Sequence, residues 1–122
     1  MITALHHVAL ICSAEEPSVK FYEALGFREV DRQVRATHED TIIWMKGHGI
    51  TLELFIDPTH PPRVSDPEAN GLRHLALHTD DVMMECERLR QLGYKPEFVR
   101  KTPGGKLSFV KDPDGTPIEL HE

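Results

Sequence analysis

The chain contains an internal repeat, and this restricts its possible folds more than any other feature of the sequence. Three pairs of matching landmarks occur in the same order: HVAL at 7–10 and HLAL at 74–77, a glycine followed by an aromatic residue at 26–27 and 93–94, and an aliphatic-Glu-Leu segment at 52–54 and 118–120. The histidine-to-glycine spacing is 19 residues in both copies, and the histidine-to-glutamate spacing is 46 residues in one and 45 in the other. The agreement indicates a duplicated module.

The segment 57–71, DPTHPPRVSDPEANG, separates the two copies and contains four prolines. Proline has no amide donor and a fixed φ, so this segment is unsuited to a helix or a central strand. We interpret it as a linker between a first module at 1–56 and a second at 72–122. A half of about 50 residues buries little core by itself, so we expect both to pack as a single domain, 1–122.

Each copy has the pattern of a βαβββ module. In the first, we expect a strand at 7–12, a helix that begins at the capping box Ser13–Glu16 and ends at Gly26, and strands at 28–34, 41–46 and 50–56. In the second, we expect a strand at 72–77, a helix between the polar residues 79–81 and Gly93, and strands at 96–101, 107–111 and 117–121. The sequence therefore predicts an α+β fold.

The composition excludes several classes of function. The 122 residues include 14 basic and 20 acidic ones, for a net charge of −6, with no Lys/Arg run, which argues against a nucleic-acid partner. No stretch approaches the roughly 18–20 apolar residues of a membrane span, and no secretory signal is recognisable at the N-terminus. Two cysteines, Cys12 and Cys86, form neither a disulfide framework nor a CxxC motif. We therefore expect a cytoplasmic protein with reduced thiols.

Four residues at equivalent positions of the repeat are typical metal ligands: His7, Glu53, His74 and Glu119. Both glutamates interrupt apolar strands, where an ionised carboxylate needs a partner, a proton or a cation. Alone, each residue is more typical of an ordinary half-exposed strand position. Together they are two nitrogen and two oxygen donors, which leave two positions of a six-coordinate divalent ion open for water or substrate.

The remaining histidines have weaker claims to a role. Strand alternation predicts that His6 points away from His7, to the opposite face. It also places His78 and His121 on the same face as His74 and Glu119, where they could contact the ligands without binding the ion. The other three lie in turns or loops: His38, His48 and His60.

The motifs HHVAL, RHLAL, FYEALGF, LELF and KDPDGTPIEL together resemble the vicinal oxygen chelate superfamily, and within it the short bacterial glyoxalase I-like proteins. The resemblance covers essentially the whole chain. It implies two tandem βαβββ modules that form a curved, mostly antiparallel sheet, the glyoxalase/bleomycin-resistance/dioxygenase fold, around one divalent metal ion. The glyoxalase ligand order His, Glu, His, Glu falls on His7, Glu53, His74 and Glu119, and the resemblance implies that the ion is Ni²⁺, Co²⁺, Zn²⁺ or Mn²⁺.

The same resemblance implies a lyase or isomerase, related to lactoylglutathione lyase, that acts on a small α-oxygenated carbonyl or its thiol adduct through an enediolate. Glu119 is then the main base and Glu53 the second carboxylate. Ile11 and Asp57 stand where such relatives carry an Arg and an Asn that help to hold the thiol, so glutathione is not implied and the thiol co-substrate stays open. The resemblance also implies a homodimer, with the site within one chain or across the dimer interface.

Other functions share this scaffold. An acyl-thioester epimerase uses the same enolate chemistry, but resemblance to that branch predicts Gln at position 53, where this chain has Glu. Phosphonate-antibiotic resistance transferases have three protein ligands, and Glu53 again argues against them. A non-catalytic binding or sequestering protein is the third alternative, against which the intact set of four ligands speaks.

Overall fold

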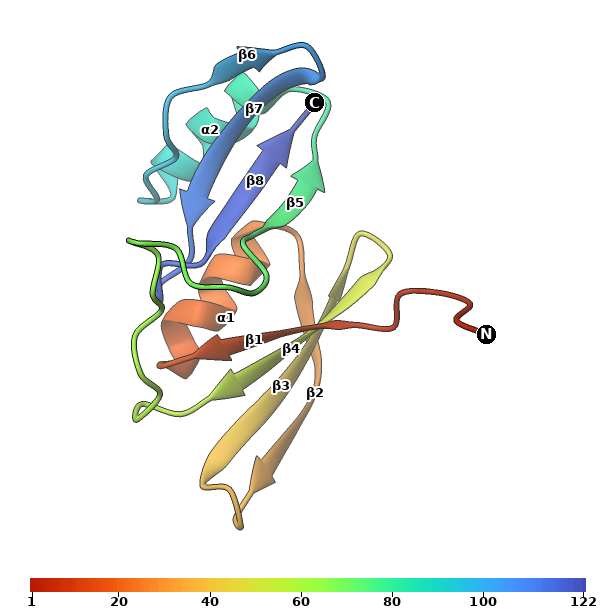
Figure 1. The fold of residues 1–122 in the computed structure, drawn as a ribbon, viewed down its shortest axis with the longest axis vertical. Coiled ribbons are helices and arrows are strands. Elements are labelled where there is room, and N and C mark those ends of the chain that lie inside the picture. Colours follow the sequence, from red (N-terminus) through yellow and green to blue (C-terminus); the bar gives the residue numbers. More distant parts are fainter. The chain divides into compact units, whose positions relative to one another are not determined.

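The computed structural model describes all 122 residues, which divide into two compact halves, Met1–Pro61 and Pro62–Glu122. The boundary lies inside the proline-rich segment 57–71. The elements of the first half are β1 (Val8–Cys12), α1 (Glu15–Ala24), β2 (Arg28–Arg35), β3 (Asp40–Gly47) and β4 (Ile50–Ile56) (Figure 1). Those of the second half are β5 (Leu75–His78), α2 (Val82–Gln91), β6 (Arg100–Thr102), β7 (Gly105–Lys111) and β8 (Pro117–His121). Both helices have ten residues, about half the length that a membrane-spanning helix needs.

Both halves have the same sheet topology. The strand order is β1-β4-β3-β2 in the first half and β5-β8-β7-β6 in the second. In each sheet the first and last strands of the module pair in parallel, and the remaining pairs are antiparallel. The fold is therefore α+β, with two mixed four-stranded sheets and two helices. The predicted duplication and the predicted βαβββ order are both confirmed.

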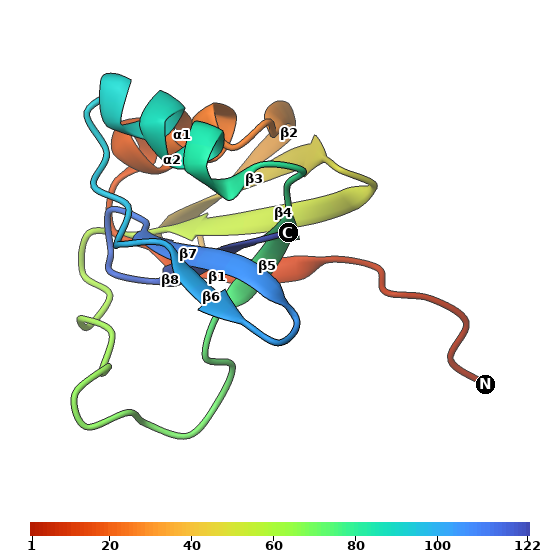
Figure 2. The same cartoon turned by 90° about the horizontal axis from the view of Figure 1, so that it is seen from above.

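One face of the first sheet is covered by α1 (Figure 2). The β4 residues Leu52 and Leu54 are fully buried there and pair with Met45 and Ile43 of β3, which are also fully buried. Glu53, between the two leucines, belongs to the opposite face because side chains alternate along a strand. The core thus fixes which side of the sheet presents the carboxylate.

The second half repeats this arrangement with α2 over its sheet (Figure 2). Ile118 and Leu120 of β8 are buried and pair with Val110 and Ser108 of β7. Glu119 lies between them and therefore belongs to the opposite face. Alternation along β4 and β8 accordingly gives the two glutamates equivalent places.

Two local predictions were wrong. The N-cap of α1 is Ala14, which makes no side-chain cap bond, so Ser13 lies one residue too early to act as the predicted cap. The strand predicted at 96–101 is limited to Arg100–Thr102, because Pro96 has no amide donor and Phe98 is 92% exposed. By contrast, Asp81 is an N-cap as expected, and its side chain accepts a bond of 2.9 Å from the Met84 amide.

Candidate metal centre

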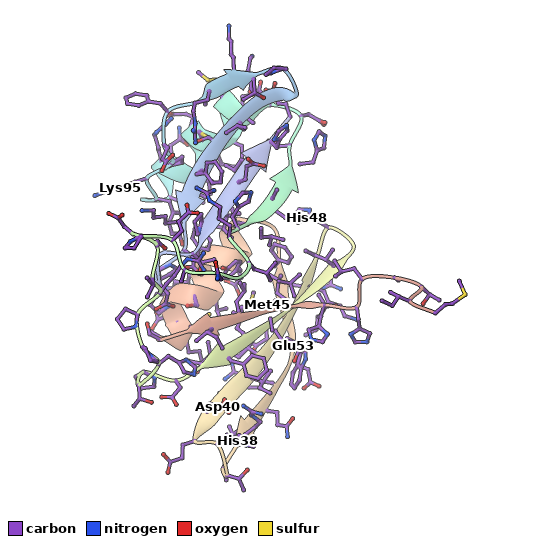
Figure 3. All side chains as sticks on the ribbon, viewed as in Figure 1. His38, Asp40, Met45, His48, Glu53 and Lys95 are labelled. Atoms are coloured by element: carbon purple, nitrogen blue, oxygen red, sulfur yellow. The ribbon has the colours of Figure 1, made fainter.

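In the first half, His7 and Glu53 face each other. His7 immediately precedes β1, and Glu53 lies on the neighbouring strand, β4 (Figure 3). Their atoms Nε2 and Oε2 are 2.6 Å apart, and the Glu53 side chain is only 13% exposed. Parallel pairing places the small residue Ala9 beside Glu53, so the strand leaves space at the carboxylate. One imidazole nitrogen and one carboxylate oxygen are thus in direct contact with each other.

His6 does not point away from His7, so this prediction was wrong. The two Nδ1 atoms are 2.8 Å apart, and the rings meet edge to face with their centroids 5.1 Å apart. The reason is that β1 begins only at Val8, so the alternation of strand side chains does not apply to the two preceding residues. His6 therefore occupies Nδ1 of His7 and leaves Nε2 to Glu53.

The second half carries the equivalent pair in the same register. Ala76 pairs with Glu119 as Ala9 pairs with Glu53, and His74 immediately precedes β5. His74 forms no ion pair with Glu119, however. Its Nδ1 lies 3.1 Å from a guanidinium nitrogen of Arg73, and because a guanidinium only donates, Nδ1 accepts this bond. The His74 ring also packs edge to face on Phe109.

Glu119 contacts a histidine other than His74. Its Oε2 lies 3.3 Å from Nδ1 of His121, whose Nε2 lies 3.1 Å from the Gly104 carbonyl oxygen. His121 thus connects the carboxylate to the β6–β7 turn, as the shared face predicted. His78 does not reach Glu119, because its ring nitrogens contact the His121 carbonyl and Asp80.

Sequence reasoning missed the residue that precedes each candidate ligand histidine. His6 and Arg73 occupy equivalent positions of the repeat, and both contact Nδ1 of the histidine that follows. The signal is present in the shared pattern of a polar residue before His-aliphatic-Ala-Leu. That pattern indicates the duplication, but it does not by itself predict a second pair of contacts.

The histidines outside this set contact main-chain or side-chain groups away from the glutamates. His48 Nε2 lies 2.7 Å from the Leu25 carbonyl oxygen, directly after α1, and His60 Nδ1 lies 3.1 Å from the Cys12 carbonyl oxygen (His48 is labelled in Figure 3). His38 contacts Thr37. These contacts favour local structural roles for all three, as the sequence indicated.

The donor set fits a divalent cation. Each half supplies one imidazole and one carboxylate, the ligand types that suit ions such as Zn²⁺, Ni²⁺ and Mn²⁺. Three or more His, Cys, Asp or Glu side chains able to hold a metal do not gather within either half. Each half by itself thus contains two of the four candidate ligands.

The chain is similar to known proteins over its whole length. The family model described as Glyoxalase/Bleomycin resistance protein/Dioxygenase superfamily matches residues 4–120. The uncharacterized protein YaeR of Escherichia coli is 38% identical over 124 residues, which cover 97% of this chain and 95% of YaeR. A probable lactoylglutathione lyase of Synechocystis is 30% identical over 125 residues, 95% of this chain and 92% of that protein. The crystal structure of a glyoxalase family protein from Enterococcus faecalis is 38% identical with a TM-score of 0.93, covering 98% and 97% of the two chains.

Proposed function

The chain belongs to the glyoxalase/bleomycin resistance protein/dioxygenase superfamily, and on that premise we propose that it is a divalent-metal-dependent lyase of the glyoxalase I type. Its substrate is a small α-oxygenated carbonyl compound or the thiol adduct of one. The similarity to a probable lactoylglutathione lyase at 30% identity supports this class of reaction.

The observation that carries the proposal is the repeated strand register. In both sheets a His-aliphatic-Ala segment runs parallel to an aliphatic-Glu-Leu segment, with the alanine paired to the glutamate. We propose that His7, Glu53, His74 and Glu119 together hold one ion, Ni²⁺, Co²⁺, Zn²⁺ or Mn²⁺. The two halves of the site come from one chain or from two chains of a homodimer. When bound, the ion acts as a Lewis acid that stabilises negative charge on adjacent substrate oxygens.

The contacts of the two glutamates favour different roles. Glu53 already lies 2.6 Å from its own histidine, so we assign it to holding the ion and the His7 ring. Glu119 makes no such contact with His74, and its Oε2 lies 3.3 Å from His121 instead. We propose that the Glu119 carboxylate removes the proton from the carbon beside the carbonyl and returns it to the neighbouring carbon.

Metal analysis and activity test this proposal together. Purified wild type, Glu53→Gln and Glu119→Gln are reloaded with Ni²⁺ or Zn²⁺, analysed for bound metal and assayed with methylglyoxal and a panel of thiols. Glu87→Gln is the control, because Glu87 is an exposed glutamate of α2 whose carboxylate makes only surface contacts, a 3.9 Å ion pair with Arg90 and a 3.5 Å bond from Gln91. We expect one ion per site and activity in wild type and control, and loss of both occupancy and turnover in the two other variants.

Two results would contradict the proposal. Bound metal without turnover for any thiol adduct would retain the metal site and refute the lyase assignment. No bound metal after reloading would make the non-catalytic binding protein the better interpretation.

We also propose a homodimer located in the cytoplasm, and a single folded domain over residues 1–122. Sedimentation equilibrium gives the oligomeric state directly. Separate expression of residues 1–61 and 62–122 tests the domain proposal, which predicts that neither half folds without the other.

A further inference from the structure

The second half contains a cavity next to its His–Glu pair. The cavity has a volume of about 340 Å³ and is formed by the segment 63–73 and the start of β8. Its lining includes Arg63, Ser65, Glu68, Asn70, Arg73 and Pro117. The volume lies at the small end of the range for ligand pockets, enough for one small polar group and its neighbours.

Arg63 closes the segment that forms this cavity. Its Nη2 donates to the carbonyl oxygens of Leu72 at 3.3 Å and Arg73 at 2.7 Å, and its Nε donates to Oγ of Ser65 at 3.1 Å. These bonds join residues up to ten positions apart in the sequence. The cavity is therefore shaped by contacts within the chain, before any ligand arrives.

The lining has an excess of positive charge. It contains the guanidinium groups of Arg63 and Arg73 but only one carboxylate, Glu68, which accepts a bond of 2.8 Å from Nε of Arg73. Nη1 of Arg63 and Nη2 of Arg73 make no hydrogen bond or ion pair in the structure. Guanidinium donors of this kind are well suited to carboxylate and phosphate oxygens.

The cavity adjoins the proposed reaction site through two of its lining residues. Arg73 contacts both sides, because its Nη1 lies 3.1 Å from Nδ1 of His74. Pro117 precedes Glu119 by two residues on β8, so both belong to the same face of the sheet. A group bound by Arg73 is therefore next to His74, the residue that follows Arg73. It is also close to Glu119, which is two residues after the lining residue Pro117 on β8.

From this arrangement we propose that the cavity binds an anionic oxygen group of the substrate, a carboxylate or a phosphate, while the substrate's carbonyl end reaches His74 and Glu119. The inference rests on the proposed function and narrows its substrate class. The substrate is then an α-oxygenated carbonyl compound with an oxyanion a few atoms away.

Titration of the full-length, isotope-labelled chain by NMR tests the cavity without any need for turnover. Inorganic phosphate and acetate are added separately at constant ionic strength, with chloride as the reference anion. We expect the amide signals of residues 65–73 to shift. The anion that binds with the higher affinity identifies whether the cavity prefers a phosphate or a carboxylate. Arg73→Gln should weaken binding about tenfold, as expected for the loss of one charge-assisted bond. Glu68→Gln should strengthen it, because the competing carboxylate is removed.

Arg32→Gln is the matched control, since Arg32 is also paired with carboxylates, Glu15 and Glu29, but lies on β2 of the other half. It should leave anion binding unchanged. No shift at 65–73, or equal binding by wild type, Arg73→Gln and Glu68→Gln, would overturn the inference. If Arg73→Gln does not fold, the affinity of Glu68→Gln for the anions still tests whether the cavity binds them. If the chain binds anions at the cavity but binds no metal after reloading, the anion-binding inference stands and only the proposed lyase function is refuted.

Discussion

Two serine side chains are completely buried, and the structure predicts opposite effects of replacing them by alanine. Ser18 lies on α1, and its hydroxyl has no hydrogen-bond partner. Ser108 lies on β7 and donates a bond of 2.7 Å to the Glu97 carbonyl oxygen. Because the two residues share chemistry and burial, they differ for this purpose mainly in whether the hydroxyl is paired.

The magnitudes follow from the cost of burying a polar group. An unpaired buried hydroxyl costs about 1–3 kcal/mol, and alanine is a better helix former than serine by roughly 0.5 kcal/mol. Removing the oxygen atom also removes its van der Waals attraction to the surrounding atoms, which offsets part of this gain. Ser18→Ala should therefore raise the free energy of unfolding by about 1–2 kcal/mol. Ser108→Ala should lower it by about 1–2 kcal/mol, because the Glu97 carbonyl loses its donor.

Urea unfolding followed by far-UV circular dichroism measures both changes, and thermal melts should show shifts of roughly 4 °C for each kcal/mol. The comparison is made on metal-free protein, so that ligand binding does not contribute to either value. Ser18→Ala less stable than wild type would refute the reasoning, as would shifts of the same sign in both variants. A less stable Ser18→Ala would mean that the hydroxyl of Ser18 is satisfied, and a more stable Ser108→Ala would mean that the bond from Ser108 to Glu97 does not stabilise the fold.

Three further predictions concern separate parts of the chain. The Arg35 guanidinium holds the pKa of the Asp40 carboxyl below its usual value, so this ion pair stabilises the fold above about pH 4. The stabilisation is lost as the pH falls through the lowered pKa. The difference in melting temperature between wild type and Asp40→Asn should therefore shrink from pH 7 to pH 3. His121→Ala should weaken metal binding about tenfold by freeing the Glu119 carboxylate, as measured by competition with a chelating dye, whereas His121→Gln should recover part of it. Gly47→Ala should lower the free energy of unfolding in urea by about 1–3 kcal/mol, because a Cβ there would lie 2.6 Å from the carbonyl oxygen of Gly26, in the turn after α1.

The fold could be predicted from the sequence largely because the same pattern of strand and helix segments occurs twice in the chain. A helix between matching strand segments is a weak indication by itself, but its recurrence at the same spacing from His7 and His74 makes the βαβββ order recognisable. The errors lie at element ends, where local signals compete. Ser13 is a good capping residue that the chain does not use as the cap, and Pro96 interrupts a run that is otherwise typical of a strand.

Less of the candidate site could be predicted. The equivalent positions of the two histidines and the two glutamates follow from the repeat, whereas the register that pairs Ala9 with Glu53 and Ala76 with Glu119 comes from the structure. The partner of each ring nitrogen could not be predicted either, because it depends on where the strand begins and on side-chain rotamers. The contact of His6 with His7 exists since β1 starts only at the next residue, a boundary that no sequence pattern locates to one position.

The duplicated backbone nevertheless produces two chemically different half-sites. Identical strand register gives each half a histidine before its first strand and a glutamate on its last, but the neighbours differ. His7 is held by a second histidine and by its own glutamate, whereas His74 is held by an arginine and Glu119 by His121. A symmetric pair of carboxylates would give neither one a distinct role in moving a proton. The asymmetry arises from the side chains that surround the shared strand register. We therefore expect His6, Arg73 and His121 to determine which glutamate holds the ion and which acts as the base.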